Sequence, residues 1–185
     1  MAGDEGHRLD SRRAYAGRLL NVDVDTVRTP NGTTLSLELV RHPGAAAVVP
    51  LLSPADSPDP HVLLLRQYRY AAGGTIWEIP AGVLEPGEAP SDCARRELRE
   101  ETGAEAERID PLTTIFTTPG FTDERIHLFL ATGIRPGSAS PNPDELIEVQ
   151  PKPLSQALAM IRDGEIADAK TVIALLYLAG FRLAM

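Results

Sequence analysis

Three glutamates of the chain lie at a spacing that suits metal binding. If their segment is helical, Glu97, Glu100 and Glu101 fall within one arc of roughly 100° on the helix surface. Carboxylates at this spacing repel each other, and a cation held between them would reverse the sign of that interaction. Oxygen ligands suit a hard ion such as Mg²⁺, which commonly also binds substrate phosphates. The alternative is a solvated charged face on which the neighbouring arginines pair with the glutamates.

The same segment carries the start and stop signals of a helix. Pro90 suits the first helical turn, and Asp92 suits the positive end of the helix. Gly103 is a favourable residue just past a helix C-terminus. Ala94 and Leu98 lie on the face next to the glutamates and can pack inward. The sequence therefore predicts a helix from about residue 90 to 102, preceded by a turn at the Pro-Gly pair 86–87.

As a whole, residues 82–104 resemble the Nudix box, GX5EX7REUXEEXGU, where U is a bulky aliphatic residue. The matching positions are Gly82, Glu88, Arg96, Glu97, Leu98, Glu100, Glu101 and Gly103. Ala104 is small for the last U. The resemblance implies hydrolysis of a nucleoside diphosphate linked to another moiety. In that reaction water attacks a phosphorus atom, and the box glutamates bind divalent metal.

The sequence on both sides of the box is similar to the ADP-ribose pyrophosphatase branch of this family. The similar runs are QYR at 67–69, WEIPAG at 77–82 and PGFTDE at 119–124. Pro119 stands fifteen residues past the box, where the branch has its own proline. The resemblance implies that Arg69, Pro119 and Gly120 bind substrate.

The resemblance also implies the roles within the site. Mg²⁺, or alternatively Mn²⁺, would be held by the Ala81 carbonyl and by Glu97, Glu100 and Glu101. Glu100 and Arg96 would be catalytic residues, and Arg96 would orient a box glutamate through a charge-assisted hydrogen bond. Glu88 would support the loop. The branch carries its general base on a later loop, where the match DELIEV places it at Glu145, with Asp144 as the alternative.

Composition narrows the class of partner. The chain has 185 residues, which predicts one domain with a modest extension. Its net charge of −8 and pI of about 5.0 argue against nucleic acid as a partner. Cys93 is the single cysteine, which suits a reducing cytoplasm and a packing role. The polar N-terminus does not resemble a signal peptide, and no apolar run is long enough to span a membrane, so we expect a cytoplasmic protein.

Alternating runs on both sides of Asn31-Gly32 predict a β-hairpin within residues 15–40, after a disordered start at 1–12. Such a sheet is too small to be stable alone, so it must pack on the main domain or on a second chain. The resemblance favours the second chain and hence a homodimer. The expected organisation is an N-terminal β region at 1–43, which forms the dimer, and a hydrolase domain at 44–185.

The remaining pattern predicts an α/β protein, and the resemblance implies the Nudix fold. Apolar runs predict strands at 45–52, 61–67, 112–118 and 126–131. Helices are expected at 154–162 and 168–183, the second apolar nearly all round and therefore well buried. The expected architecture is a mixed β-sheet sandwiched between α-helices, with a small N-terminal β region.

The resemblance implies Mg²⁺-dependent hydrolysis of ADP-ribose to AMP and ribose 5-phosphate. The alternatives are another nucleoside diphosphate sugar or a dinucleotide as substrate, or a non-catalytic module that senses ADP-ribose. One departure concerns the base pocket: Leu37 stands where the branch often has an arginine, and Arg41 is displaced along the strand.

Overall fold

A computed structural model describes residues 6–18, 20–54, 56–137 and 146–183 of the chain. The chain divides into two compact units. One unit combines Met1–Gly44 with Phe116–Arg125, and the other combines Ala45–Ile115 with Ile126–Met185. No helix in the described ranges is long and apolar enough to cross a membrane.

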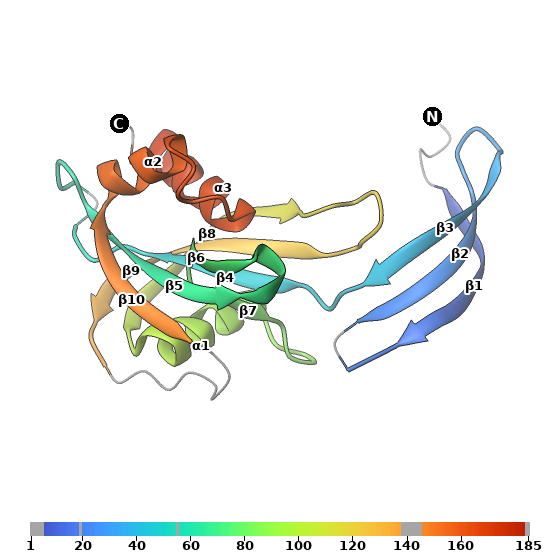
Figure 1. The fold of residues 1–185 in the computed structure, drawn as a ribbon, viewed down its shortest axis with the longest axis horizontal. Helices are drawn as coiled ribbons and strands as arrows, with labels where there is room; N and C mark the ends of the chain where they lie inside the picture. Colours follow the sequence, from blue (N-terminus) through green and yellow to red (C-terminus); the bar gives the residue numbers. More distant parts are fainter. Residues whose placement is uncertain (1–5, 19, 55, 138–145, 184–185) are drawn as a thin grey trace. The chain divides into compact units, whose positions relative to one another are not determined.

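The N-terminal unit is built on a three-stranded antiparallel sheet in the order β1-β2-β3 (Figure 1). Its strands are β1 (His7–Ala16), β2 (Asn21–Arg28) and β3 (Thr34–Arg41). The predicted hairpin is confirmed as β2 and β3. Its turn places Gly32 at φ +85°, a conformation that glycine adopts at low cost, and Thr29 N donates to Thr33 O at 2.8 Å.

Strand β1 corrects the prediction of a disordered start, because residues 7–12 belong to this strand. Apolar alternation gave no signal for it, since polar pairs hold it to β2. Arg13 forms an ion pair with Asp23, and Ser11 Oγ donates to Asp25 Oδ1 at 2.6 Å. Both aspartates are buried, and their pKa values are lowered, chiefly by the hydrogen bonds from Arg13 and Ser11 respectively.

Arg41 joins β3 to the segment Phe116–Arg125 within this unit. Its guanidinium pairs with Asp23 at 3.1 Å, with Asp123 at 3.2 Å and, at short range, with Asp25. The backbone N–H of His42 also donates to Asp123 at 2.8 Å. Arg41, which is displaced along the strand from the position where the branch often has an arginine, is therefore held by three carboxylates.

The second unit contains two sheets. One is antiparallel, in the order β10-β5-β6, with β10 (Ile147–Pro153), β5 (His61–Arg69) and β6 (Gly74–Glu78). The other is mixed, in the order β7-β4-β9-β8, with β7 (Ala81–Val83), β4 (Ala45–Pro50), β9 (Arg125–Arg135) and β8 (Glu105–Phe116). Strand β4 runs parallel to β9 and antiparallel to β7. The four predicted strands are confirmed as β4, β5, β8 and β9.

Strand β4 is buried on both faces, which explains its uninterrupted apolar sequence. One face, with Ala47 and Val49, packs in a core with β5 and the helices α2 (Leu154–Arg162) and α3 (Ala169–Tyr177). The other face, with Ala46 and Val48, packs against helix α1 (Pro90–Thr102). Figure 1 shows α1 on one side of the sheets and α2 and α3 on the other, as predicted for an α/β sandwich.

The C-terminal helix differs from its prediction in two respects. Helix α3 ends at Tyr177 and continues as a π-helical turn, Leu178–Arg182. Only one face is buried, with Thr171, Ala174 and Leu175, whereas Leu176 is half exposed. The helix packs on one side of the core, so its outer apolar side chains face away from the sheets.

Candidate active site

Helix α1 is fixed by a proline at its first position, by a glycine cap at its C-terminus and by one buried face. It begins at Pro90 and is followed by Gly103 at φ +71°, whose N–H donates to Arg99 O at 2.8 Å. The predicted boundaries are confirmed. Ala94 and Leu98 are fully buried against β4. This packing turns the glutamate arc toward strand β7, so that Glu101 and Glu97 are also buried while Glu100 stays partly exposed.

Strand β7 lies directly against these glutamates. The backbone N–H of Ala81 donates to Glu101 Oε2 at 3.1 Å. A Cβ atom on Gly82 would overlap with the carboxylate of Glu97, so only glycine allows this approach. Cys93 Sγ lies 3.5 Å from Gly82 O. Burial raises the pKa of the Cys93 thiol to about 12, which favours the packing role over a reactive one.

Arg96 donates hydrogen bonds to three carboxylates of the acidic cluster. Its Nη1 donates to Glu97 at 2.6 Å and to Glu100 at 3.3 Å. Its Nε donates to Glu88 at 2.8 Å, and this contact lowers the pKa of Glu88 to about 2. Glu88 in turn accepts from the backbone N–H of Glu85 at 3.0 Å. Arg96 therefore orients the helix glutamates and, through Glu88, the loop that precedes the helix.

The donor set is composed of oxygen atoms, which suits a hard divalent cation. Glu97, Glu101 and the backbone of Ala81 come together where α1 meets β7. Within the described residues no three His, Cys, Asp or Glu side chains converge at metal-binding spacing. A bound metal would therefore take further oxygen ligands from the backbone, from water or from substrate phosphates, which is common for Mg²⁺.

Arg69 lies at the end of β5 in the same unit, next to a buried carboxylate. Its Nε donates at 2.7 Å to Glu78, a residue only 3% exposed. Burial opposes the charge of Arg69, but the carboxylates of Glu78, Glu101 and Asp168 outweigh it and raise the pKa of Arg69. Arg69 is thus within electrostatic range of Glu101 on helix α1.

Sequence reasoning missed the polar network behind Glu78. Lys170 forms an ion pair with Glu78 and a second one with Asp168 at 3.1 Å. Asp168 caps helix α3 by accepting from the N–H of Thr171 at 3.0 Å. Thr171 Oγ1 accepts from the N–H of Ile79 at 2.9 Å. The available signal was a glutamate between Trp77 and Ile79 at the end of a strand, because a buried carboxylate requires partners.

Replacing Thr171 with valine is expected to destabilise the protein by about 1–3 kcal/mol, because the N–H of Ile79 would lose its acceptor inside the core. Thr171→Ser keeps the hydroxyl and is the matched control. Urea denaturation of both variants measures the effect. Equal stabilities of the valine and serine variants would show that the hydroxyl does not hold α3 to the strand.

The structure does not test every predicted site residue. Pro119 and Gly120 belong to the N-terminal unit, whose position relative to the carboxylates is not determined. Glu145 and Asp144 lie outside the described residues. Those brought together are Ala81, Arg96, Glu97, Glu100 and Glu101, with Arg69 in the same unit.

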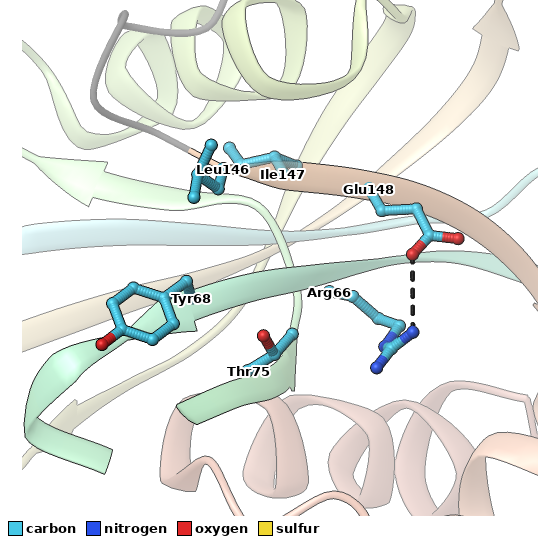
Figure 2. A pocket seen from close by; sticks show the side chains of 6 residues that line it. All are labelled: Arg66, Tyr68, Thr75, Leu146, Ile147 and Glu148. Atoms are coloured by element: carbon cyan, nitrogen blue, oxygen red, sulfur yellow. Dashed lines mark hydrogen bonds and ion pairs between the residues drawn. The ribbon is translucent and has the colours of Figure 1, made fainter. Parts of the chain in front are cut away.

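A hollow of about 480 Å³ lies elsewhere on this unit (Figure 2). It is lined by Arg66, Tyr68, Thr75, Leu146, Ile147 and Glu148. Arg66 and Tyr68 alternate along β5 with Arg69, so they point to the opposite face of that sheet. The hollow therefore lies on the face of that sheet opposite to Arg69.

Fold and site together define a class: an α/β protein in which one helix presents acidic side chains, held by an arginine, to the edge of a mixed sheet. A NUDIX domain model matches residues 41–175, and the chain belongs to this family. The prediction of the Nudix family is confirmed. Nudix hydrolases generally use divalent metal ions.

Two relatives align with nearly the whole chain. A "Methanol dehydrogenase activator" of Bacillus methanolicus is 40% identical, with 94% of this chain and 92% of that protein covered. An "ADP-ribose pyrophosphatase" of Bacillus subtilis is 37% identical, with 96% and 95% covered. A solved "ADP compounds hydrolase" superposes with a TM-score of 0.78 at 23% identity, covering 94% and 92%, which supports the fold.

Proposed function

We propose that the protein hydrolyses the pyrophosphate bond of ADP-ribose to give AMP and ribose 5-phosphate. The observation that carries this proposal is the docking of the box glutamates, ordered by Arg96, on the backbone of Ala81 and Gly82. The near-full-length similarity to an ADP-ribose pyrophosphatase supports the choice of substrate.

In the proposed mechanism Glu97, Glu101 and the Ala81 carbonyl would hold Mg²⁺, or Mn²⁺, with Glu100 nearby. The chemistry supplied by such a metal would be polarisation of the pyrophosphate and a lower pKa for a bound water. Arg96 keeps the glutamates in place. Substrate phosphate contacts Arg69, and the segment with Pro119 and Gly120 contributes further substrate contacts. Glu145 takes the proton of the attacking water while the water oxygen bonds to one phosphorus atom. The bond from that phosphorus to the bridging oxygen breaks, and AMP and ribose 5-phosphate leave.

The identity of the nucleotide is tested by comparing turnover over a panel of compounds. The panel contains ADP-ribose, other nucleoside diphosphate sugars and dinucleotides. Because three aspartates hold Arg41, it is a poor candidate for a base-pocket arginine, and this makes the alternatives worth measuring. If another compound were turned over faster, that compound would replace ADP-ribose as the proposed substrate. Binding of ADP-ribose without release of AMP under Mg²⁺ would instead indicate a sensing module.

Activity is expected to require Mg²⁺ or Mn²⁺ and to disappear in excess EDTA. Ca²⁺ is larger and less strict in geometry, so it should support little turnover. The measurement is release of AMP from each metal-reconstituted sample. Full activity in excess EDTA would contradict the assignment of Glu97, Glu101 and Ala81 as metal ligands.

We further propose that the protein is a homodimer. The N-terminal region 1–43 forms the interface between the two subunits, and residues 44–185 form the hydrolase domain. Every residue of β1 is exposed, and Leu35 and Leu37 on β3 are 42% and 38% exposed, so the sheet has apolar surface to cover. Sedimentation at micromolar concentration should give twice the monomer mass of 19.9 kDa. A monomer would refute the proposal. Removal of residues 1–40 should yield monomers and lower activity.

A cytoplasmic location is proposed because Cys93 is the single cysteine and is buried as a free thiol. Cell fractionation tests it. Recovery of the protein mainly outside the cytoplasmic fraction would contradict it.

A further inference from the structure

The two carboxylate oxygens of Glu78 are held by different cations. Oε2 accepts from Arg69 Nε at 2.7 Å, and Oε1 accepts from Lys170 Nζ. The side chain of Glu78 is 4% exposed and that of Lys170 is 11% exposed, so this contact is shielded from water. In the structure Glu78 therefore presents one oxygen to Arg69 and the other to Lys170.

This division determines how Arg69 is held. An arginine beside a free carboxylate commonly forms two parallel hydrogen bonds, which engage two of its N–H groups. Here the hydrogen bonds among the described residues engage Arg69 through Nε alone. The side chain of Arg69 is 42% exposed, so the guanidinium is not enclosed by the protein. A guanidinium in this state can still offer two parallel donors to a phosphate.

Lys170 is itself held in place from the opposite side. Asp168 pairs with its Nζ at 3.1 Å and also caps helix α3. Through Thr171 the same turn of the helix binds the N–H of Ile79, the residue after Glu78. Lys170 therefore reaches Glu78 from the first turn of helix α3, and this turn is hydrogen-bonded to the residue that follows Glu78.

We propose that Lys170 is a positioning residue for substrate binding. By occupying Oε1 of Glu78, it limits Arg69 to a single contact and leaves the Nη groups of Arg69 for a substrate phosphate. The inference rests on the part of the proposed function that assigns Arg69 to the substrate. Without Lys170, Glu78 would accept both donors of Arg69 and withdraw the guanidinium from the site.

The test measures substrate binding and turnover for Lys170→Met, alone and combined with Arg69→Met, in the full-length chain. Calorimetry with ADP-ribose in EDTA gives affinity without cleavage, and steady-state kinetics give KM and kcat. We expect Lys170→Met to weaken binding and raise KM by about tenfold or more, the effect of losing one charged hydrogen bond, with little change in kcat. In the Arg69→Met background the same change should alter affinity by less than about twofold.

Lys152 provides the matched control. It is the only other lysine of the chain, and its Nζ lies 5.2 Å from the centre of the Trp77 ring. Lys152→Met removes the same charge and should leave KM unchanged. If Lys170→Met does not fold, Lys170→Gln is measured in its place, since glutamine keeps a donor near Glu78 and should lose only part of the affinity.

Two results would overturn the proposal. One is wild-type affinity of the Lys170 variants. The other is an equally large loss of affinity with and without Arg69, which would indicate a purely structural lysine. If the wild-type protein cleaves another pyrophosphate compound faster than ADP-ribose, the proposed substrate fails. The Lys170 experiment then uses that compound and remains decisive.

Discussion

Changing Glu145 to glutamine is expected to slow turnover by about 10²–10⁴-fold, the usual effect of losing a general base. Glutamine keeps the size of the side chain but cannot take the proton of the attacking water. Raising the Mg²⁺ concentration should not restore the rate, because the glutamates of helix α1 are intact. Substrate affinity should also survive, since Glu145 is not assigned to the metal that would neutralise the phosphates. Turnover as a function of Mg²⁺ concentration, with affinity by calorimetry, measures both effects.

Glu101→Gln is the matched comparison for this prediction. Glu101 is 3% exposed and accepts from the N–H of Ala81, so its oxygens stand where α1 meets β7. Losing this charge should lower metal affinity and turnover together, and added Mg²⁺ should recover part of the rate. Near-normal turnover of Glu145→Gln would show that Glu145 is not the general base. Asp144 would then be the next candidate, followed by Glu100. Recovery of that variant with metal would make Glu145 a metal ligand.

The sequence predicted the carboxylate helix closely because its signals are local. Pro90 and Gly103 mark its two ends, and the apolar positions 94 and 98 mark its buried face. Each of these features depends on residues within a few positions of each other. The strands β4 and β5 were predictable for the same reason, since burial on both faces gives an unbroken apolar run.

The parts that the sequence did not predict depend on pairs of distant charges. Strand β1 is held by Arg13 and Asp23, and the inner network is held by Glu78 and Lys170, which are 92 residues apart. A charged residue in a sequence is by default expected at the surface, because burial without a partner is costly. The partner is known only once the fold brings it close, so neither network has a sequence signature. The same holds for Arg41 and its three aspartates.

Changing Gly82 to alanine is expected to reduce turnover by about 10²-fold, the order found when a catalytic group moves by about 1 Å. A Cβ atom at this position would overlap with the carboxylate of Glu97, so that carboxylate must move. The overlapping atoms are the end of a flexible side chain, and Gly82 needs no left-handed backbone conformation. Stability should therefore change much less than activity. Turnover, metal affinity and urea denaturation of the variant separate these effects.

Gly180 provides the control for this last prediction. Beyond its chain neighbours and the backbone of its own helix, no atom lies within 4 Å of a Cβ placed there, so Gly180→Ala should leave turnover unchanged. A second comparison uses Glu97→Ala, which removes the carboxylate that the new methyl group displaces. In that background Gly82→Ala should lower the rate by less than about twofold, because the two changes act through the same contact. A full additional loss would show that Gly82 serves the site in another way, through the position of the Ala81 backbone beside Glu101.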